Sequence, residues 1–161
     1  MGDVMRNPKN RSRERGVDLV EAAFGLFIFL LLLLGIMDFG RAVYAYHFVS
    51  SAARQGSRWA SVRGSTCKSL SGGCPASAAN VQTYVQGLAP GGIDSTQITA
   101  TTTWPRNPSN CPSGGASNAP LCDVKVVVSY NFSFILLPRK LIAGLPGTFS
   151  MNSTSDLIIS Q

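Results

Sequence analysis

Charged residues are scarce in this sequence, and those it has are unevenly spread. They make up 14% of 161 residues, against about 25% in a typical soluble domain. From Arg41 onward the nine basic residues are scattered and form no lysine- or arginine-rich run. Nucleic-acid binding calls for such a cluster, so we expect no nucleic-acid partner.

Histidine and acidic residues are also too few to suggest catalysis. His47 is the only histidine, and Asp94, Asp123 and Asp156 are the only acids beyond Arg41. A Ser-His-Asp or Cys-His arrangement would have to use His47, and no phosphate-binding or dinucleotide-binding glycine motif is present. We therefore expect no enzymatic activity and no cofactor.

One long apolar run extends from Val17 to Met37 and reads VDLVEAAFGLFIFLLLLLGIM. As a helix it would be about 31 Å long, which matches a bilayer core of about 30 Å. A signal peptide would have a shorter apolar region followed by a small-residue cleavage site. A buried core helix of this size would be unusual in so short a chain. We therefore predict a single membrane span.

Flanking charge predicts the orientation of this span. Five basic residues precede it, namely Arg6, Lys9, Arg11, Arg13 and Arg15. The positive-inside rule places that end in the cytoplasm, so the C-terminal part is expected to be periplasmic or extracellular. On the outer side, Arg41 follows Asp38 by three residues on the same helical face.

Two acids, Asp18 and Glu21, lie in the first turns of the span. A charged side chain at the helix centre costs about 2.5–3.5 kcal/mol on insertion scales. Asp18 is close enough to the headgroups to need no special explanation. Glu21 lies about one turn deeper and is a candidate functional residue.

The surroundings of Glu21 resemble the processing site of type IV prepilins. A basic stretch ends at Gly16, and Glu21 is the fifth residue after it. The resemblance implies that a membrane-embedded prepilin peptidase cleaves between Gly16 and Val17, and that Glu21 takes part in assembly. Glycine would let an extended backbone enter the peptidase cleft, and the new ammonium at Val17 could pair with Glu21 of a neighbouring subunit.

The span and the residues that follow it, from about 15 to 62, resemble the TadE-like family, the minor pseudopilins of the tight-adherence (Flp) pilus system. The matching positions are Glu21, Gly35, Asp38, Phe39, Gly40, Arg41, Ala53, Arg54, Gly56, Arg58 and Ala60. The resemblance implies a structural role in initiating, anchoring or tipping a pilus, in or from the bacterial inner membrane. Its implied partners are other pilins, through the N-terminal helix, and the pilus assembly platform.

The rest of the chain predicts a small α+β domain on a continuous helix. Ala45, Val49, Ala52, Gly56 and Ala60 form one small-residue stripe at helical spacing, so the helix is expected to continue to about Val62. We predict a second helix at 76–88 opened by Pro75, and strands at 96–104, 123–134 and 149–159. The predicted fold is pilin-like: a leader (1–16), a long helix (17–62) and a domain (63–161) with an antiparallel sheet of about three strands.

Four cysteines, Cys67, Cys74, Cys111 and Cys122, all lie beyond the span. An oxidising compartment favours disulfides, and four cysteines allow three pairings. Each close pair flanks its own loop, so we expect Cys67–Cys74 and Cys111–Cys122. Six and ten intervening residues do not fit a C-x2-4-C metal site, so no bound metal is expected.

Two other functions remain open from the sequence. The chain could be a membrane-anchored binding module, an adhesin or envelope sensor, that depends on the exposed loop 105–120 rather than on Glu21. It could also be a pseudopilin of a secretion or DNA-uptake machine, although the resemblance of residues 35–41 to the TadE-like family argues against that.

Overall fold

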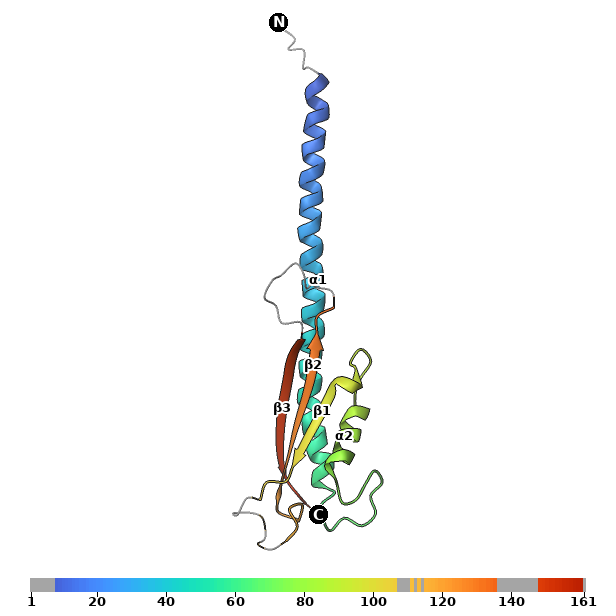
Figure 1. Cartoon of the computed structure of the whole chain (residues 1–161), viewed down its shortest axis with the longest axis vertical. Helices are drawn as coiled ribbons and strands as arrows, with labels where there is room; N and C mark the ends of the chain where they lie inside the picture. The colour runs from blue at the N-terminus through green and yellow to red at the C-terminus, as the bar shows by residue number, and fades with distance from the viewer. Residues whose placement is uncertain (1–7, 107–110, 112, 114, 136–147, 161) are drawn as a thin grey trace.

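The computed structural model of the chain is an α+β fold built on one very long helix (Figure 1). It describes residues 8–106, 111, 113, 115–135 and 148–160, with side chains from Gly16 onward. The elements in this part of the chain are α1 (Pro8–Ser61), α2 (Ala78–Gly87), the 3-10 turn η1 (Ser95–Gln97), β1 (Ile98–Thr103), β2 (Asp123–Ser133) and β3 (Thr148–Ile158). The predicted fold class is confirmed.

The three strands form an antiparallel sheet in the order β1-β2-β3. The C-terminal half of α1 lies along β2 and β3, and α2 packs on β1 beside it. The N-terminal half of α1 projects alone from this body (Figure 1). The folded unit therefore includes the second half of α1 as one of its layers.

The core lies between α1 and the sheet, on the face that the sequence alternation predicts. The side chains of β2 that are buried against the helices are Val124, Val126, Val128, Tyr130 and Phe132. The other face of β2 is half-buried, including Val127. A strand with one covered face carries apolar residues at every second position, and β2 follows this rule.

The small-residue stripe of α1 lets the helix approach the sheet closely. Ala45, Val49, Ala52 and Ala60 are all buried. At Gly56, a Cβ atom would lie 3.0 Å from Val85 Cγ2 and 3.3 Å from Val126 Cγ1. This glycine therefore lies where α1, α2 and β2 meet, and a side chain there would push the three elements apart.

Polar side chains join the helices to the sheet. Gln82 of α2 covers the free edge of β1: its Nε2 donates to the carbonyl of Ile98 at 2.9 Å, and its Oε1 accepts from the backbone N–H of Ala100. These bonds satisfy backbone groups that an edge strand would otherwise leave unpaired. On the other side, Ser57 of α1 and Ser155 of β3 share a hydroxyl hydrogen bond of 2.8 Å.

Several boundaries differ from those expected. α2 begins at Ala78 and is not opened by Pro75, because Ser77 caps it by accepting a hydrogen bond from the Asn80 N–H. β1 begins at Ile98 because Asp94 caps η1 just before it. The hydrogen bonds to Asp94 from the Thr96 hydroxyl and then from the Thr96 N–H lower the pKa of this carboxyl.

α1 begins at Pro8, ahead of the predicted span. The residues from Pro8 to Gly16 include arginine, lysine and glutamate, which favour helix, and proline is well tolerated in a first turn. Residues 1–7 of the leader lie outside the described residues. So do 107–110, 112 and 114 of the loop 105–120.

The close approach at Gly56 is testable by overpacking. We expect Gly56→Val to lower the free energy of unfolding of the outer domain by about 1–3 kcal/mol, because inserted methyl groups displace well-packed neighbours. The matched control is Gln55→Val, which places the same side chain at the adjacent exposed position of α1. Urea unfolding in detergent, followed by tryptophan fluorescence, measures both variants. Equal stabilities would contradict the packing described.

Candidate assembly site on the N-terminal helix

The N-terminal half of α1 is an uncovered apolar surface. Large side chains exposed along it are Val17, Leu19, Val20, Phe24, Leu26, Phe27, Ile28, Phe29, Leu30, Leu32, Leu33, Ile36 and Met37. Within the described residues, α1 is the one helix long and apolar enough to cross a membrane, and none of its most apolar stretch is buried. A helix satisfies its own backbone groups in lipid, so this half is a candidate single-pass anchor.

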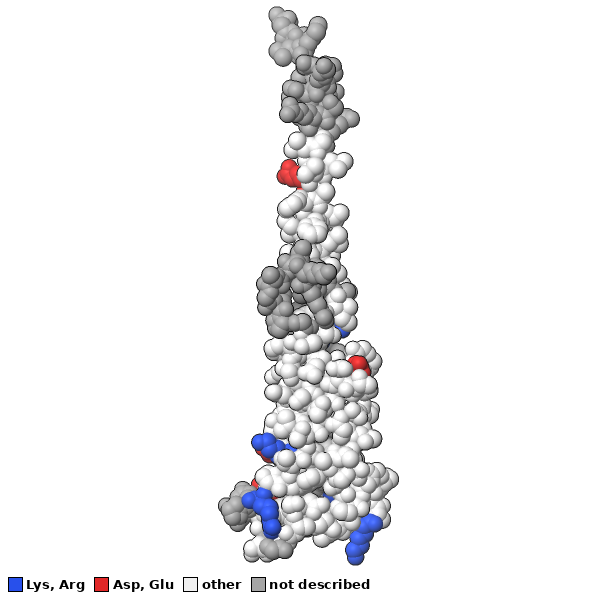
Figure 2. Space-filling model, viewed as in Figure 1, with Lys and Arg blue, Asp and Glu red and all other residues white. Residues whose placement is uncertain are grey.

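Gly16, Val17 and Glu21 lie together on this uncovered stretch. A Cβ atom added at Gly16 would meet no atom within 4 Å, and Val17 is 63% exposed. Glu21 is exposed one turn further along, at a rise of about 6 Å from Val17. Figure 2 shows the acidic surface as an isolated patch on an otherwise uncharged part of the helix. A peptidase or a second helix would therefore meet no steric obstacle from the described part of this chain.

Asp38 and Arg41 mark the junction between the uncovered half of α1 and the sheet. The Arg41 guanidinium donates to the Asp38 carboxylate at 2.9 Å, as their spacing of three residues predicts. Asp38 is fully buried, at 0% exposure, and the guanidinium carbon of Arg41 lies 5.5 Å from the centre of the Phe132 ring. A cation over an aromatic face is attracted to the ring quadrupole, so Arg41 links the helix to the end of β2.

Gly40, which lies between Asp38 and Arg41 in the sequence, is surrounded by open space. A Cβ atom at Gly40 would meet no atom within 4 Å. The structure therefore brings Asp38 and Arg41 together but gives Gly40 no packing role among the described residues.

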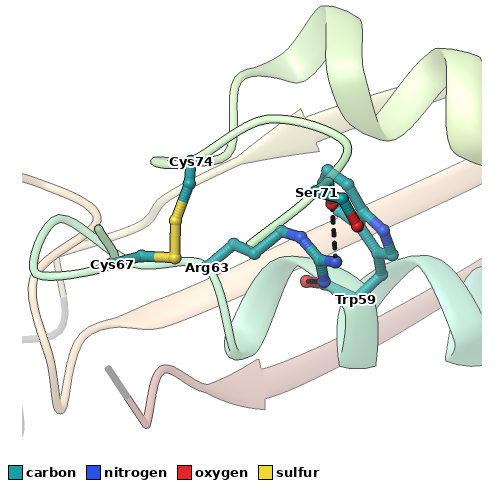
Figure 3. The surroundings of a disulfide bond; sticks show 5 residues. All are labelled: Trp59, Arg63, Cys67, Ser71 and Cys74. Carbon is teal, nitrogen blue, oxygen red and sulfur yellow. Dashed lines mark hydrogen bonds between the residues drawn. A yellow bond between two sulfur atoms is a disulfide. The ribbon is translucent and has the colours of Figure 1, made fainter. Parts of the chain in front are cut away.

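At the opposite end of α1, an arginine and a disulfide fold a loop back onto the helix (Figure 3). The Arg63 guanidinium lies 4.1 Å from the Trp59 ring centre and donates to the Trp59 and Ser71 carbonyls, both at 3.1 Å. Trp59 also stacks on Tyr84 of α2, with ring centres 5.2 Å apart. This stack holds the C-terminus of α1 against α2.

The four cysteines form two disulfides in the structure. Cys67 joins Cys74, with 5.6 Å between Cα atoms, and Cys111 joins Cys122, with 4.3 Å between Cα atoms. These are the pairs expected from the sequence, and each closes its own loop. Across the described residues, no three His, Cys, Asp or Glu side chains come together as a metal site.

Sequence reasoning missed Gln82 and Arg63 as residues that hold the domain together. Gln82 binds backbone atoms of a strand sixteen and eighteen residues away, and no local pattern signals such a bond. Arg63 follows Trp59 by four residues, which is a helical spacing. That spacing was the one available signal for the stack.

Comparison with known proteins finds a family similar to one segment of the N-terminal helix. Residues 16–58 match the model of the family described as TadE-like protein, and this segment lies wholly within α1. No curated protein and no solved structure matches the chain. Residues 16–58 of the N-terminal helix are therefore similar to the TadE-like family, as the sequence resemblance predicted.

Proposed function

We propose that this chain is a minor pseudopilin that helps to initiate, anchor or tip a tight-adherence (Flp) pilus. The observation that carries the proposal is the division of α1. One half is packed into a domain with two disulfides, and the other half is exposed along most of its length, apolar and marked by acids near the start of its apolar run. Such a helix can sit in lipid first and pack against other helices afterwards. The TadE-like match over α1 supports the same role.

In this proposal a prepilin peptidase removes residues 1–16 by cutting between Gly16 and Val17. An aspartic peptidase binds its substrate extended, so α1 must unwind locally at the scissile bond. Gly16 eases this step, because glycine is about 1 kcal/mol less favourable than alanine in a helix interior. The absence of a Cβ also lets the backbone approach the peptidase closely.

Cleavage would create a charged partner for Glu21. The new ammonium at Val17 is one helical turn from Glu21, and Glu21 has no ion pair with any other described residue. When two helices lie side by side, Glu21 of one can pair with the Val17 ammonium of the next. In lipid such a pair offsets the desolvation of both charges and selects neighbours that have been cut.

The proposal also assigns a place to each part of the chain. Residues 1–16 are a cytoplasmic leader, residues 17–62 an anchoring and packing helix in the bacterial inner membrane, and residues 63–161 a domain on the periplasmic or extracellular side. The two disulfides suit an oxidising compartment. The partners are other pilins along α1 and the assembly platform that extracts the subunit.

Processing is testable by the mass of the chain. In cells with an active prepilin peptidase, we expect the chain to begin at Val17. Gly16→Leu should leave the leader in place, because its side chain obstructs the cleft. Gly25→Leu is the matched control, since Gly25 is an equally open glycine of the same helix, and it should be cut normally. Intact wild-type chains beginning at Met1 would refute the processing step.

Assembly is testable at Glu21. We expect Glu21→Ala to abolish incorporation into pili while leaving expression and folding intact, because Glu21 is exposed and far along α1 from the described part of the domain. Glu21→Asp keeps the negative charge, and this variant should still be incorporated into pili in part. Electron microscopy and immunodetection of sheared pili measure the incorporation of both variants. Normal piliation with Glu21→Ala would contradict the role of Glu21 and favour the membrane-anchored binding module instead.

A further inference from the structure

α1 carries charges at both of its ends that nothing in the described residues neutralises. Asp18 and Glu21 are exposed near its start, and Arg54 and Arg58 are exposed near its end. The ion pair formed among the described side chains is Asp38–Arg41, and none of the four residues takes part in it. The helix therefore presents two acids at the start of its apolar run and two arginines near its C-terminal end.

Arg54 and Arg58 lie on the side of α1 that the sheet does not cover. Each is two residues from Gly56, which faces α2 and β2, so each points about 160° away from that contact around the helix axis. Asp18 and Arg54 are separated by about ten full helical turns, or about 54 Å. Their side chains therefore leave the helix on the same side.

A lipid surface does not fit the basic end. Arg54 lies about 25 Å along the helix beyond Met37, the end of the apolar run. A headgroup layer is only about 5–8 Å thick on each side of the hydrocarbon core. With the first half of α1 in the bilayer, Arg54 and Arg58 project well outside it, so lipid headgroups do not contact them.

We propose that the basic end of α1 docks the start of α1 from a second copy of this chain, with Asp18 of that copy against Arg54. The two helices run parallel, and the second copy is displaced by about 54 Å along the helix axis, away from the bilayer. The last two turns of one helix then lie beside the first two turns of the other. This contact rests on the proposed function, because Asp18 reaches that height only after the second copy has left the bilayer.

Charge makes this contact depend on removal of the leader. The first 21 residues carry five basic side chains, four acidic ones and the terminal ammonium, so the uncut end is positive and is repelled by Arg54 and Arg58. After a cut at Gly16–Val17, the Val17 ammonium, Asp18 and Glu21 remain, and the end is negative. Glu21 and the Val17 ammonium serve the contact between adjacent helices, which leaves Asp18 for Arg54.

The contact is testable by cysteine cross-linking in cells that assemble the surface structure. Two differently tagged full-length copies are co-expressed, one with Asp18→Cys and the other with Arg54→Cys. The native cysteines are all paired, so mild oxidation of the sheared surface fraction reports on the new thiols. We expect a mixed-tag dimer on a non-reducing gel. The matched control replaces Arg54→Cys with Gln55→Cys, an exposed position about 100° around the helix, and should give several-fold less dimer.

Charge reversal provides a second test of the contact between Asp18 and Arg54. Arg54→Asp should reduce recovery of the chain in the surface fraction, and Asp18→Arg in the same chain should restore it. Equal dimer yields with the two cysteine positions, or no dimer although both copies reach the surface fraction, would overturn the docking contact and leave the proposed function standing. Absence of unmodified chain from the surface fraction would overturn the proposed function and this contact together.

Discussion

The structure depends on the close packing of one face of α1 against the valines of β2 and α2. Ala52, Gly56 and Ala60 bring the helix backbone near the sheet, and a Cβ at Gly56 would meet Val85 at 3.0 Å. This contact lets a helix whose first half is a candidate membrane anchor become a structural layer of a small domain. Small residues suit such a face, because they bring backbones together without side-chain interference.

The remaining contacts hold the domain in place around this packed face. Arg41 links the membrane end of the helix to β2, and Arg63 and Trp59 fix its other end. Gln82 covers one sheet edge and Ser57 binds the strand at the other. Each disulfide closes a loop near the far end of α1, which limits the freedom of the segments with the least buried apolar surface. Force applied along the helix during extraction would therefore be carried into the sheet at several points.

Much of this fold could be predicted from the sequence. The apolar run is recognised by its length of 21 residues. The small-residue stripe from Ala45 to Ala60 has the helical period, and the apolar residues of β2 alternate as in a strand. The structure agrees with each of these patterns. The predictions were less accurate for boundaries that single hydrogen bonds determine. The Ser77 cap places the start of α2 later than predicted, and the Asp94 cap does the same for β1. Gln82 was missed because its partners lie far along the chain.

The candidate site was predictable in position but not in its contacts. A glycine, an acid five residues later and an apolar run locate Gly16 and Glu21 from sequence, since these features are local. The pairing that we propose for Glu21 is between chains, so it would depend on the assembly and not on the fold of one subunit. Asp38 and Arg41 are different, because their spacing on one helix predicts a contact that the chain forms by itself.

The central claim is that one unbroken helix serves both the bilayer and the domain. Hydrogen–deuterium exchange of the full chain in lipid nanodiscs tests this most directly. The account predicts continuous protection from Val17 through Ala60, with slow exchange across residues 37–45, where lipid gives way to the sheet. Rapid exchange confined to residues 37–45, between two protected segments, would show a hinge there and contradict the account.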